Sequence, residues 1–80
     1  MKSLVLYKKD TCPYCQKVMN YISTTGRKDI IFKDIINDPA AANELVEVGG
    51  KRQVPCLFID GKPLYESSDI IEWLKGNPAE

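Results

Sequence analysis

Histidine is absent from this 80-residue sequence, and its charges balance, with 11 Lys and Arg residues against 11 Asp and Glu residues. The missing imidazoles exclude cysteine–histidine nucleophile pairs and remove a common zinc ligand. The balanced charge provides no broad attraction toward nucleic acid or an anionic membrane, so we expect neither as a partner. No hydrophobic run approaches the ~20 residues of a membrane-spanning helix.

The amino terminus lacks the hydrophobic core of a signal peptide, because the apolar run at residues 4–7 gives way to Lys8, Lys9 and Asp10. Without such a leader, an odd number of cysteines does not fit a secreted disulfide scaffold. We therefore expect a cytoplasmic protein. The chain has no visible linker, repeat or low-complexity stretch, so it is expected to form a single domain over residues 1–80 and to be a monomer.

Hydrophobic spacing and turn signals predict seven elements in the order β-α-β-α-β-β-α. Strands are expected at residues 3–7, 30–35, 56–59 and 62–65, and helices at about 13–25, 40–48 and 68–74. Asp60-Gly61 is a strong hairpin signal, and Pro63 favours an edge position for the last strand. Ser67 or Ser68 is expected to cap the last helix. A right-handed crossover would make the first two strands parallel, which predicts an α/β fold with a four-stranded mixed sheet flanked by helices.

The run Cys12-Pro13-Tyr14-Cys15 lies where the first strand gives way to the first helix. Spacing i to i+3 in a helical turn places both sulfurs on one side, close enough to form a disulfide. Free N–H groups and the helix dipole at Cys12 favour the thiolate, which is the attacking species in disulfide exchange. A zinc site completed by another chain is the alternative, because only Cys56 remains here as a further ligand. The motif predicts redox chemistry without a bound metal. Cys56 is expected to be a small, semi-buried strand residue, with a glutathionylated or oxidatively regulated thiol as the alternative.

Three segments of the chain together resemble the glutaredoxin family, in the family's order and over nearly the whole length. They are Cys12-Pro13-Tyr14-Cys15, Gln53-Val54-Pro55 and Ser68-Asp69-Ile70. The resemblance implies a thioredoxin-like fold and a glutathione-dependent oxidoreductase that reduces protein disulfides and protein–glutathione mixed disulfides. Glutathione would be the reducing co-substrate, with no other cofactor bound. Cys12 would be the nucleophile, Cys15 the resolving thiol, and Pro55 a cis-proline facing them.

The same resemblance implies a glutathione site assembled from three parts of the chain. The backbone of Val54 would pair with the cysteinyl part, and Tyr14 would flank the tripeptide. Lys9 would lie near the glycine carboxylate. Ser68 and Asp69 would hold the γ-glutamyl end, where a helix N-terminus suits a carboxylate and an acidic side chain suits an ammonium group.

The segment before the last helix departs from many glutaredoxins, which have two glycines there. Tyr65-Glu66-Ser67 instead resembles the N-terminal domain of glutathione transferases, where a Glu/Gln–Ser pair holds the γ-glutamyl group, so Ser67 is a further candidate ligand. Gln53 also replaces the usual threonine. Two alternatives stay open: an electron donor served by thioredoxin reductase, and an iron–sulfur protein in which Cys12 and glutathione ligate a cluster between two subunits.

Overall fold

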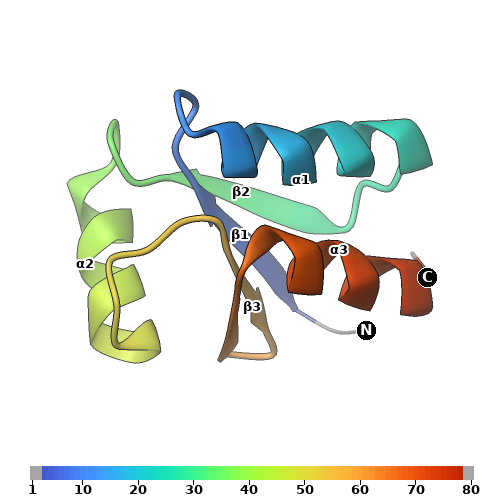
Figure 1. Ribbon diagram of the computed structural model, residues 1–80. Coiled ribbons are helices and arrows are strands. Elements are labelled where there is room, and N and C mark those ends of the chain that lie inside the picture. Colours follow the sequence, from blue (N-terminus) through green and yellow to red (C-terminus); the bar gives the residue numbers. More distant parts are fainter. Residues whose placement is uncertain (1–2, 79–80) are drawn as a thin grey trace.

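The computed structural model describes residues 3–78 and confirms the predicted order of elements (Figure 1). The strands are β1 (Leu4–Lys8), β2 (Ile30–Asp34), β3 (Cys56–Ile59) and β4 (Lys62–Tyr65), and the helices are α1 (Pro13–Thr25), α2 (Pro39–Gly49) and α3 (Ser67–Gly76). The sheet order is β2-β1-β3-β4, with β2 parallel to β1 and the remaining pairs antiparallel. This is the thioredoxin-like mixed sheet that the sequence predicted.

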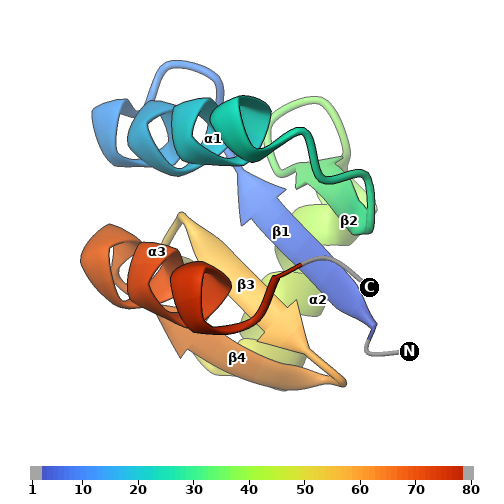
Figure 2. The same cartoon turned by 90° about the vertical axis from the view of Figure 1, so that its right-hand side faces the viewer.

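Helices cover both faces of the sheet, with α1 and α3 on one side and α2 on the other (Figure 2). Strand side chains alternate between faces, so Leu4 and Leu6 pack against α1 and α3, whereas Tyr7 belongs to the cluster beneath α2. Burial on both faces explains why β1 and β3 read as nearly continuous apolar runs. Among residues 3–78, no helix is long and apolar enough to cross a membrane.

The ends of α1 and α2 follow the local signals in the sequence. Pro13 occupies the first turn of α1, where its missing N–H needs no intrahelical partner. The Asp38 side chain accepts a hydrogen bond from the N–H of Ala40 at 3.1 Å and so caps α2. Each helix is followed by a left-handed glycine, Gly26 (φ 71°) and Gly50 (φ 88°), whose N–H returns to the last turn.

The start of α3 corrects the sequence-based prediction that Ser67 or Ser68 would be the cap. Both serines lie inside the helix, and the preceding residue, Glu66, has φ 73° and makes no capping hydrogen bond through its side chain. A positive φ in a residue other than glycine costs about 1–3 kcal/mol, so the surrounding structure must hold this turn in place. Smaller shifts occur at two strand ends: β1 runs to Lys8, and β2 stops before the buried Ile35.

The β3–β4 connection is the two-residue hairpin that the sequence predicted. Asp60 and Gly61 both have positive φ, 51° and 84°, as a tight turn of this kind requires. Pro63 is on β4, an edge strand, where a missing N–H is tolerated. The hairpin returns the chain so that α3 starts beside the segment that precedes β3 (Figure 1).

Candidate active site

Cys12 is the residue at which the loop after β1 becomes helix α1. Its backbone is extended (φ −84°, ψ 119°), its N–H donates to the carbonyl of Lys9 at 3.1 Å, and its carbonyl accepts the N–H of Gln16 at 3.0 Å. The half-buried side chain points toward Val54, with Sγ 3.9 Å from that residue's carbonyl oxygen. The first turn of the helix therefore holds the sulfur next to free N–H groups and beside the segment before β3.

Cys15 is one helical turn further on and has no exposed surface. Its Sγ accepts a hydrogen bond from the N–H of Lys9 at 3.4 Å. Both cysteines are free thiols. Only Cys12 is accessible to a substrate, which fits the predicted division into an attacking and a resolving thiol.

The pKa values of the Cys12 and Cys15 thiols are shifted in opposite directions. Partial burial by itself would raise the pKa of Cys12. Hydrogen bonds from the backbone N–H groups of Cys15 and Tyr14 and from the Cys15 thiol lower it, as does the charge of Lys9, and the pKa is lowered overall. Burial, reinforced by the hydrogen bond and charge of Cys12, raises the pKa of Cys15 to about 12. Cys12 is thus the thiol that ionises first and can attack a disulfide.

Of the two lysines before Cys12, Lys8 is paired with carboxylates and Lys9 stabilises the Cys12 thiolate. Asp10 is paired with Lys8, whose ammonium group also lies 3.6 Å from Asp34. The Asp10 carboxylate is thereby compensated, and Lys9 acts on the Cys12 thiolate. The amide of Gln16 adds to the order of this loop by donating to the carbonyl of Asp10 at 2.8 Å.

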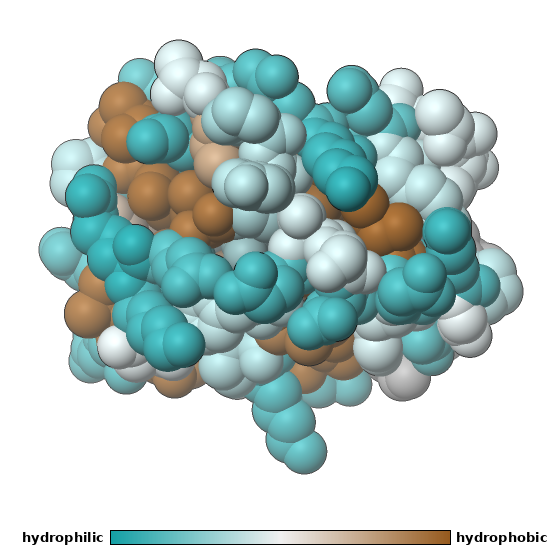
Figure 3. Space-filling view, viewed as in Figure 1, coloured by the Kyte–Doolittle hydropathy of each residue, from teal (hydrophilic) through white to brown (hydrophobic). Residues whose placement is uncertain are grey.

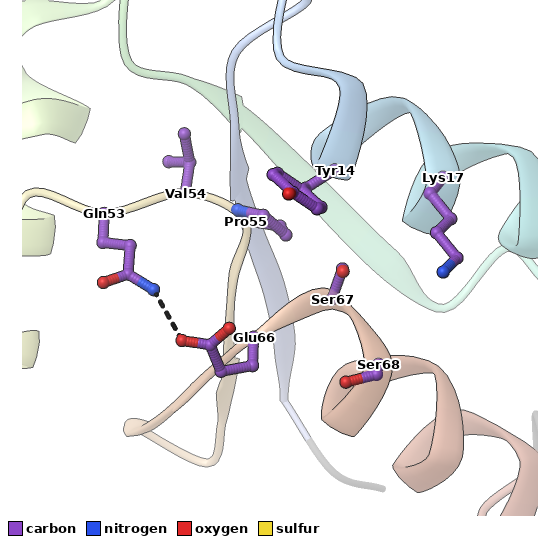
Figure 4. A pocket seen from close by; sticks show the side chains of 8 residues that line it. All are labelled: Tyr14, Lys17, Gln53, Val54, Pro55, Glu66, Ser67 and Ser68. Atoms are coloured by element: carbon purple, nitrogen blue, oxygen red, sulfur yellow. Dashed lines mark hydrogen bonds between the residues drawn. The ribbon is translucent and has the colours of Figure 1, made fainter.

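A cavity of about 520 Å³ lies between α1, the segment before β3 and the start of α3 (Figure 4). The residues that line it are Tyr14, Lys17, Gln53, Val54, Pro55, Glu66, Ser67 and Ser68. The Val54 side chain points away from the two serines, so this residue presents its backbone to the cavity. The Val54–Pro55 peptide bond is cis, as the resemblance to glutaredoxins implied.

The cavity brings together most of the predicted ligand residues but not all of them. Tyr14, Val54, Pro55, Ser67 and Ser68 line it, and Ser67 is largely buried there. Two predicted residues lie elsewhere: Lys9 lines a separate hollow of about 190 Å³, and Asp69 is exposed on the first turn of α3.

Two charged groups, Lys17 and Glu66, also line the cavity. Lys17 was not among the predicted ligands, although it lies one turn beyond Tyr14 on α1, a spacing that could have suggested a shared face. Glu66 belongs to the Glu–Ser pair that pointed to Ser67 but was not itself predicted as a ligand. The Gln53 amide donates to the Glu66 carboxylate at 3.1 Å and so joins the segment before the cis-proline to the start of α3, a contact across 13 residues that has no local signal.

Apolar surface surrounds the start of α1. In Figure 3, brown surface extends from the loop after β2 to the segment before β3, on the side of the molecule where α1 begins. Tyr14 and Ile36 are among the exposed large apolar side chains, at 64% and 56%. Isolated apolar residues are common on surfaces, but the exposed Tyr14 ring is on the first turn of α1 beside Cys12 and offers a partner protein a contact next to the reactive thiol.

The remaining cysteine is not part of this reactive group. Cys56 is fully buried on β3, and burial raises the pKa of its thiol to about 11. This matches the prediction of a strand residue, with deeper burial than expected. Among residues 3–78, no group of three or more His, Cys, Asp or Glu side chains is placed to hold a metal ion.

Comparison with known proteins assigns the chain to a family. The family model for glutaredoxin matches residues 4–64. The chain belongs to the glutaredoxin family. Glutaredoxin 3 of Escherichia coli is 31% identical over 72 residues, which are 88% of this chain and 83% of that protein. This glutaredoxin is therefore a thiol–disulfide oxidoreductase with the Cys12–Cys15 pair as its reactive group.

Solved structures agree with the assignment and with the mixed character of the last helix. Wheat glutaredoxin superposes with a TM-score of 0.70 at 27% identity, covering 94% of this chain and 73% of that one. A glutathione S-transferase from Methylobacillus flagellatus superposes with a TM-score of 0.76 at 26% identity. The match covers 95% of this glutaredoxin but only 37% of the transferase, so the similarity concerns one part of the larger enzyme.

Proposed function

We propose that this glutaredoxin uses glutathione to reduce protein disulfides and protein–glutathione mixed disulfides. The observation that carries the proposal is the placement of an accessible thiol of lowered pKa, Cys12, between a buried partner thiol and a cavity with groups for both ends of an amino acid. The Methylobacillus transferase of similar fold was solved with glutathione bound, which supports this ligand for the cavity.

Reduction of a mixed disulfide needs only Cys12. Its thiolate attacks the glutathionyl sulfur, the bond to the protein cysteine breaks, and the departing protein thiolate takes up a proton. A second glutathione thiolate then attacks the sulfur of the Cys12-bound glutathione. Glutathione disulfide leaves, and Cys12 returns as a thiolate.

Reduction of a protein disulfide adds a step at Cys15. Once Cys12 is bonded to the substrate, it no longer carries the negative charge that contributes to raising the pKa of Cys15. Cys15 then loses its proton more easily, attacks the sulfur of Cys12 and releases the substrate as a dithiol. Two glutathione molecules reduce the resulting Cys12–Cys15 disulfide and leave as glutathione disulfide.

Within the proposed complex, the γ-glutamyl end occupies the cavity at the start of α3. Backbone N–H groups of the first turn and the hydroxyls of Ser67 and Ser68 suit its carboxylate. The sequence assigns its ammonium group to Asp69, and Glu66, which lines the cavity, is a second acceptor for the same group. Lys9 is the proposed partner of the glycine carboxylate at the opposite end.

Protein substrates would approach over the apolar surface that includes Tyr14 and Ile36. We propose the cytoplasm as the compartment, because thiol reductants there keep cysteines reduced and supply the electrons that the reaction needs.

The test is a coupled assay with glutathione, glutathione reductase and NADPH. Cys12→Ser is expected to abolish turnover of both substrate types. Cys15→Ser is expected to reduce a glutathione mixed disulfide but to lose most activity toward a protein disulfide. The opposite pattern for the two variants would reverse the assigned roles, and an inactive parent protein would show that glutathione is not the reductant.

Binding of the two ends of glutathione is tested by turnover as a function of glutathione concentration. An exposed ion pair contributes at most ~1 kcal/mol, so Lys9→Ala should weaken glutathione use no more than several-fold. Asp69→Ala should be more harmful, because several charge-assisted hydrogen bonds converge at the γ-glutamyl end. If Glu66→Gln raises the KM and Asp69→Ala leaves it unchanged, the ammonium group binds at Glu66 instead.

A further inference from the structure

The two edges of the sheet differ in how well they are protected against another strand. At the β4 edge, Pro63 has no N–H to offer and Lys62 brings a charge, and both features discourage strand addition. The β2 edge has Ile30-Ile31-Phe32 at its centre and no proline. Within residues 3–78, β2 pairs with β1 on one side and with no strand on the other.

Large apolar side chains are exposed on both faces of β2. Ile30 is buried in the cluster beneath α1 and α3, so Phe32 is on that same face and Ile31 is on the face of α2. Ile31 is nevertheless 60% exposed and Phe32 45% exposed, because neither helical layer fully covers this edge. An exposed apolar edge strand is a template for pairing with another chain.

The charges that flank β2 select a second copy of β2 as the partner. The segment at residues 28–34 reads Lys-Asp-Ile-Ile-Phe-Lys-Asp. Residues 28 and 29 immediately precede β2. If two copies pair antiparallel about a two-fold axis at Ile31 and the pairing extends to these two residues, each Lys28 faces the other copy's Asp34, and each Asp29 faces the other copy's Lys33. Opposite charges directly across a strand pair are favourable.

Neighbouring registers lose this match. Strands related by a two-fold axis can shift only so that side chains keep their faces, which moves the centre to Ile30 or Phe32. The first places Arg27 opposite Lys33, a pair of like charges. The second places Lys33 opposite Ile31 and Asp34 opposite Ile30, so that charges face apolar side chains.

We infer that this glutaredoxin forms a symmetric dimer by antiparallel pairing of β2 strands centred on Ile31. The monomer predicted from the sequence would be its dilute form. Within β2 the contact pairs only residues 30–32 of the two copies, and it reaches residues 28–34 when residues 28 and 29 extend the strand. This is much smaller than a standard protein interface, so the dimer is weak and depends on concentration. The inference goes beyond the proposed redox function and does not depend on it.

The charged groups of this edge already have partners within one copy, and dimerisation adds to them. Asp29 is paired with Arg27 at 2.8 Å, and Lys33 with Glu44 at 2.7 Å. Asp34 lies 3.6 Å from the ammonium group of Lys8 and accepts the N–H of Ile36 at 2.8 Å. Lys28 is exposed at the start of the segment and has no charge partner among the ion pairs of the described chain. Lys28 is therefore the residue to change when the charge match is tested.

The experiment is sedimentation velocity of the full chain from about 10 μM to about 1 mM, with a reductant present so that disulfide-linked dimers cannot form. The parent protein is expected to shift from monomer to dimer over this range. Ile31→Lys places like charges opposite each other at the two-fold axis and should weaken dimerisation by at least about tenfold. Lys28→Glu reverses two symmetric pairs and should weaken it by about fivefold or more.

Two control variants make the same kinds of substitution, apolar to lysine and lysine to glutamate, at positions outside β2. Val48→Lys alters an equally exposed apolar residue on α2, and Lys62→Glu reverses a charge on the opposite edge of the sheet. Both are expected to dimerise like the parent. A parent that stays monomeric throughout, or equal effects of Ile31→Lys and Val48→Lys, would overturn the inference. Disulfide turnover of Ile31→Lys should match that of the parent, which shows that the variant is folded.

Discussion

At the scale of single residues, the chemistry depends on the difference between two thiols one helical turn apart. Cys12 has a lowered pKa, so alkylation of the reduced protein by iodoacetamide should be faster near pH ~7 than that of a free thiol with a pKa of ~8.5. The rate should rise with pH as Cys12 ionises, and the midpoint of that rise should lie below ~8.5. Mass spectrometry of the product as a function of pH would measure this midpoint and identify the cysteine.

Two variants test which groups determine the midpoint of the pH dependence of alkylation. Cys12→Ser should remove the fast phase altogether, because Cys15 and Cys56 are buried. Lys9→Ala should raise the midpoint, since it removes a charge that favours the thiolate. A midpoint at or above ~8.5 in the parent would contradict the prediction.

Glu66 has a backbone conformation that suits glycine, and this makes a second prediction at the same scale. Glu66→Gly and Glu66→Ala both lose the hydrogen bond from Gln53, but only glycine relieves the positive φ. The glycine variant should therefore be more stable to urea than the alanine variant by about 1 kcal/mol. At an ordinary position alanine is the more stabilising of the two, so an alanine variant of equal or higher stability would rule out strain at Glu66.

At the scale of secondary-structure elements, α2 depends on its N-terminal cap. Asp38→Ala removes the acceptor for the N–H of Ala40 and should lower the free energy of unfolding by about 1 kcal/mol. In a domain of this size, such a loss lowers the Tm by about 4–8 °C. Asp38→Asn retains a capping oxygen and should unfold close to the parent. Equal melting of all three proteins would show that the cap contributes little.

The elements that the sequence predicted well are those whose signals lie within the element itself. Pro13, Asp38 and the paired glycines after α2 mark helix ends through local hydrogen bonding, and Asp60-Gly61 marks a turn. The predicted start of α3 was wrong because Glu66 adopts a positive φ that local preference would not select. Its side chain contacts Gln53, which is distant in sequence, and the serines that looked like caps are part of the helix.

The candidate site likewise contains parts that the sequence predicted and parts that depend on the fold. The reactive pair and the cis-proline follow from short motifs, whereas the cavity depends on α1 and α3 lying side by side. Lys17 and Glu66 line the same cavity only because the chain is folded, and no spacing rule connects them. Glutathione recognition could therefore be predicted in outline, including the Glu66–Ser67 pair, but the presence of Lys17 in the cavity could not.

At the scale of the whole molecule, Arg27 joins the segment between α1 and β2 to the end of α3. Its guanidinium group is paired with both carboxylate oxygens of Asp29 and also donates to the carbonyls of Leu74 and Asn77, at 3.4 and 3.0 Å. It thereby adds hydrogen bonds to carbonyl groups at the end of α3, where helical acceptors run out of donors, although the Leu74 carbonyl also accepts the N–H of Asn77 at 3.3 Å. These contacts span 47 and 50 residues, which is why no sequence pattern indicated them.

The buried thiols make the stability of the reduced protein sensitive to alkaline pH. In the folded state burial raises the pKa of Cys15 to about 12 and that of Cys56 to about 11, whereas both should ionise near ~8.5 in the unfolded chain. Above that pH the unfolded state binds fewer protons than the folded state, so the free energy of unfolding falls as the pH rises. The stabilising contribution is complete below pH ~8.5 and is lost progressively toward the folded-state values.

Cys56→Val tests this last effect because it keeps an apolar side chain in the core and removes one titrating thiol. Urea unfolding of the reduced proteins at several values between about pH 8 and about pH 10.5 should show a shallower loss of stability in Cys56→Val than in the parent. The lysines and tyrosines that also titrate in this range are common to both proteins, so their effects cancel in the comparison. Cys12→Ser removes a thiol with the opposite shift and should not make the loss shallower. Parallel pH profiles for the parent and Cys56→Val would mean that the Cys56 thiol ionises equally easily in both states, and that its burial does not control its pKa.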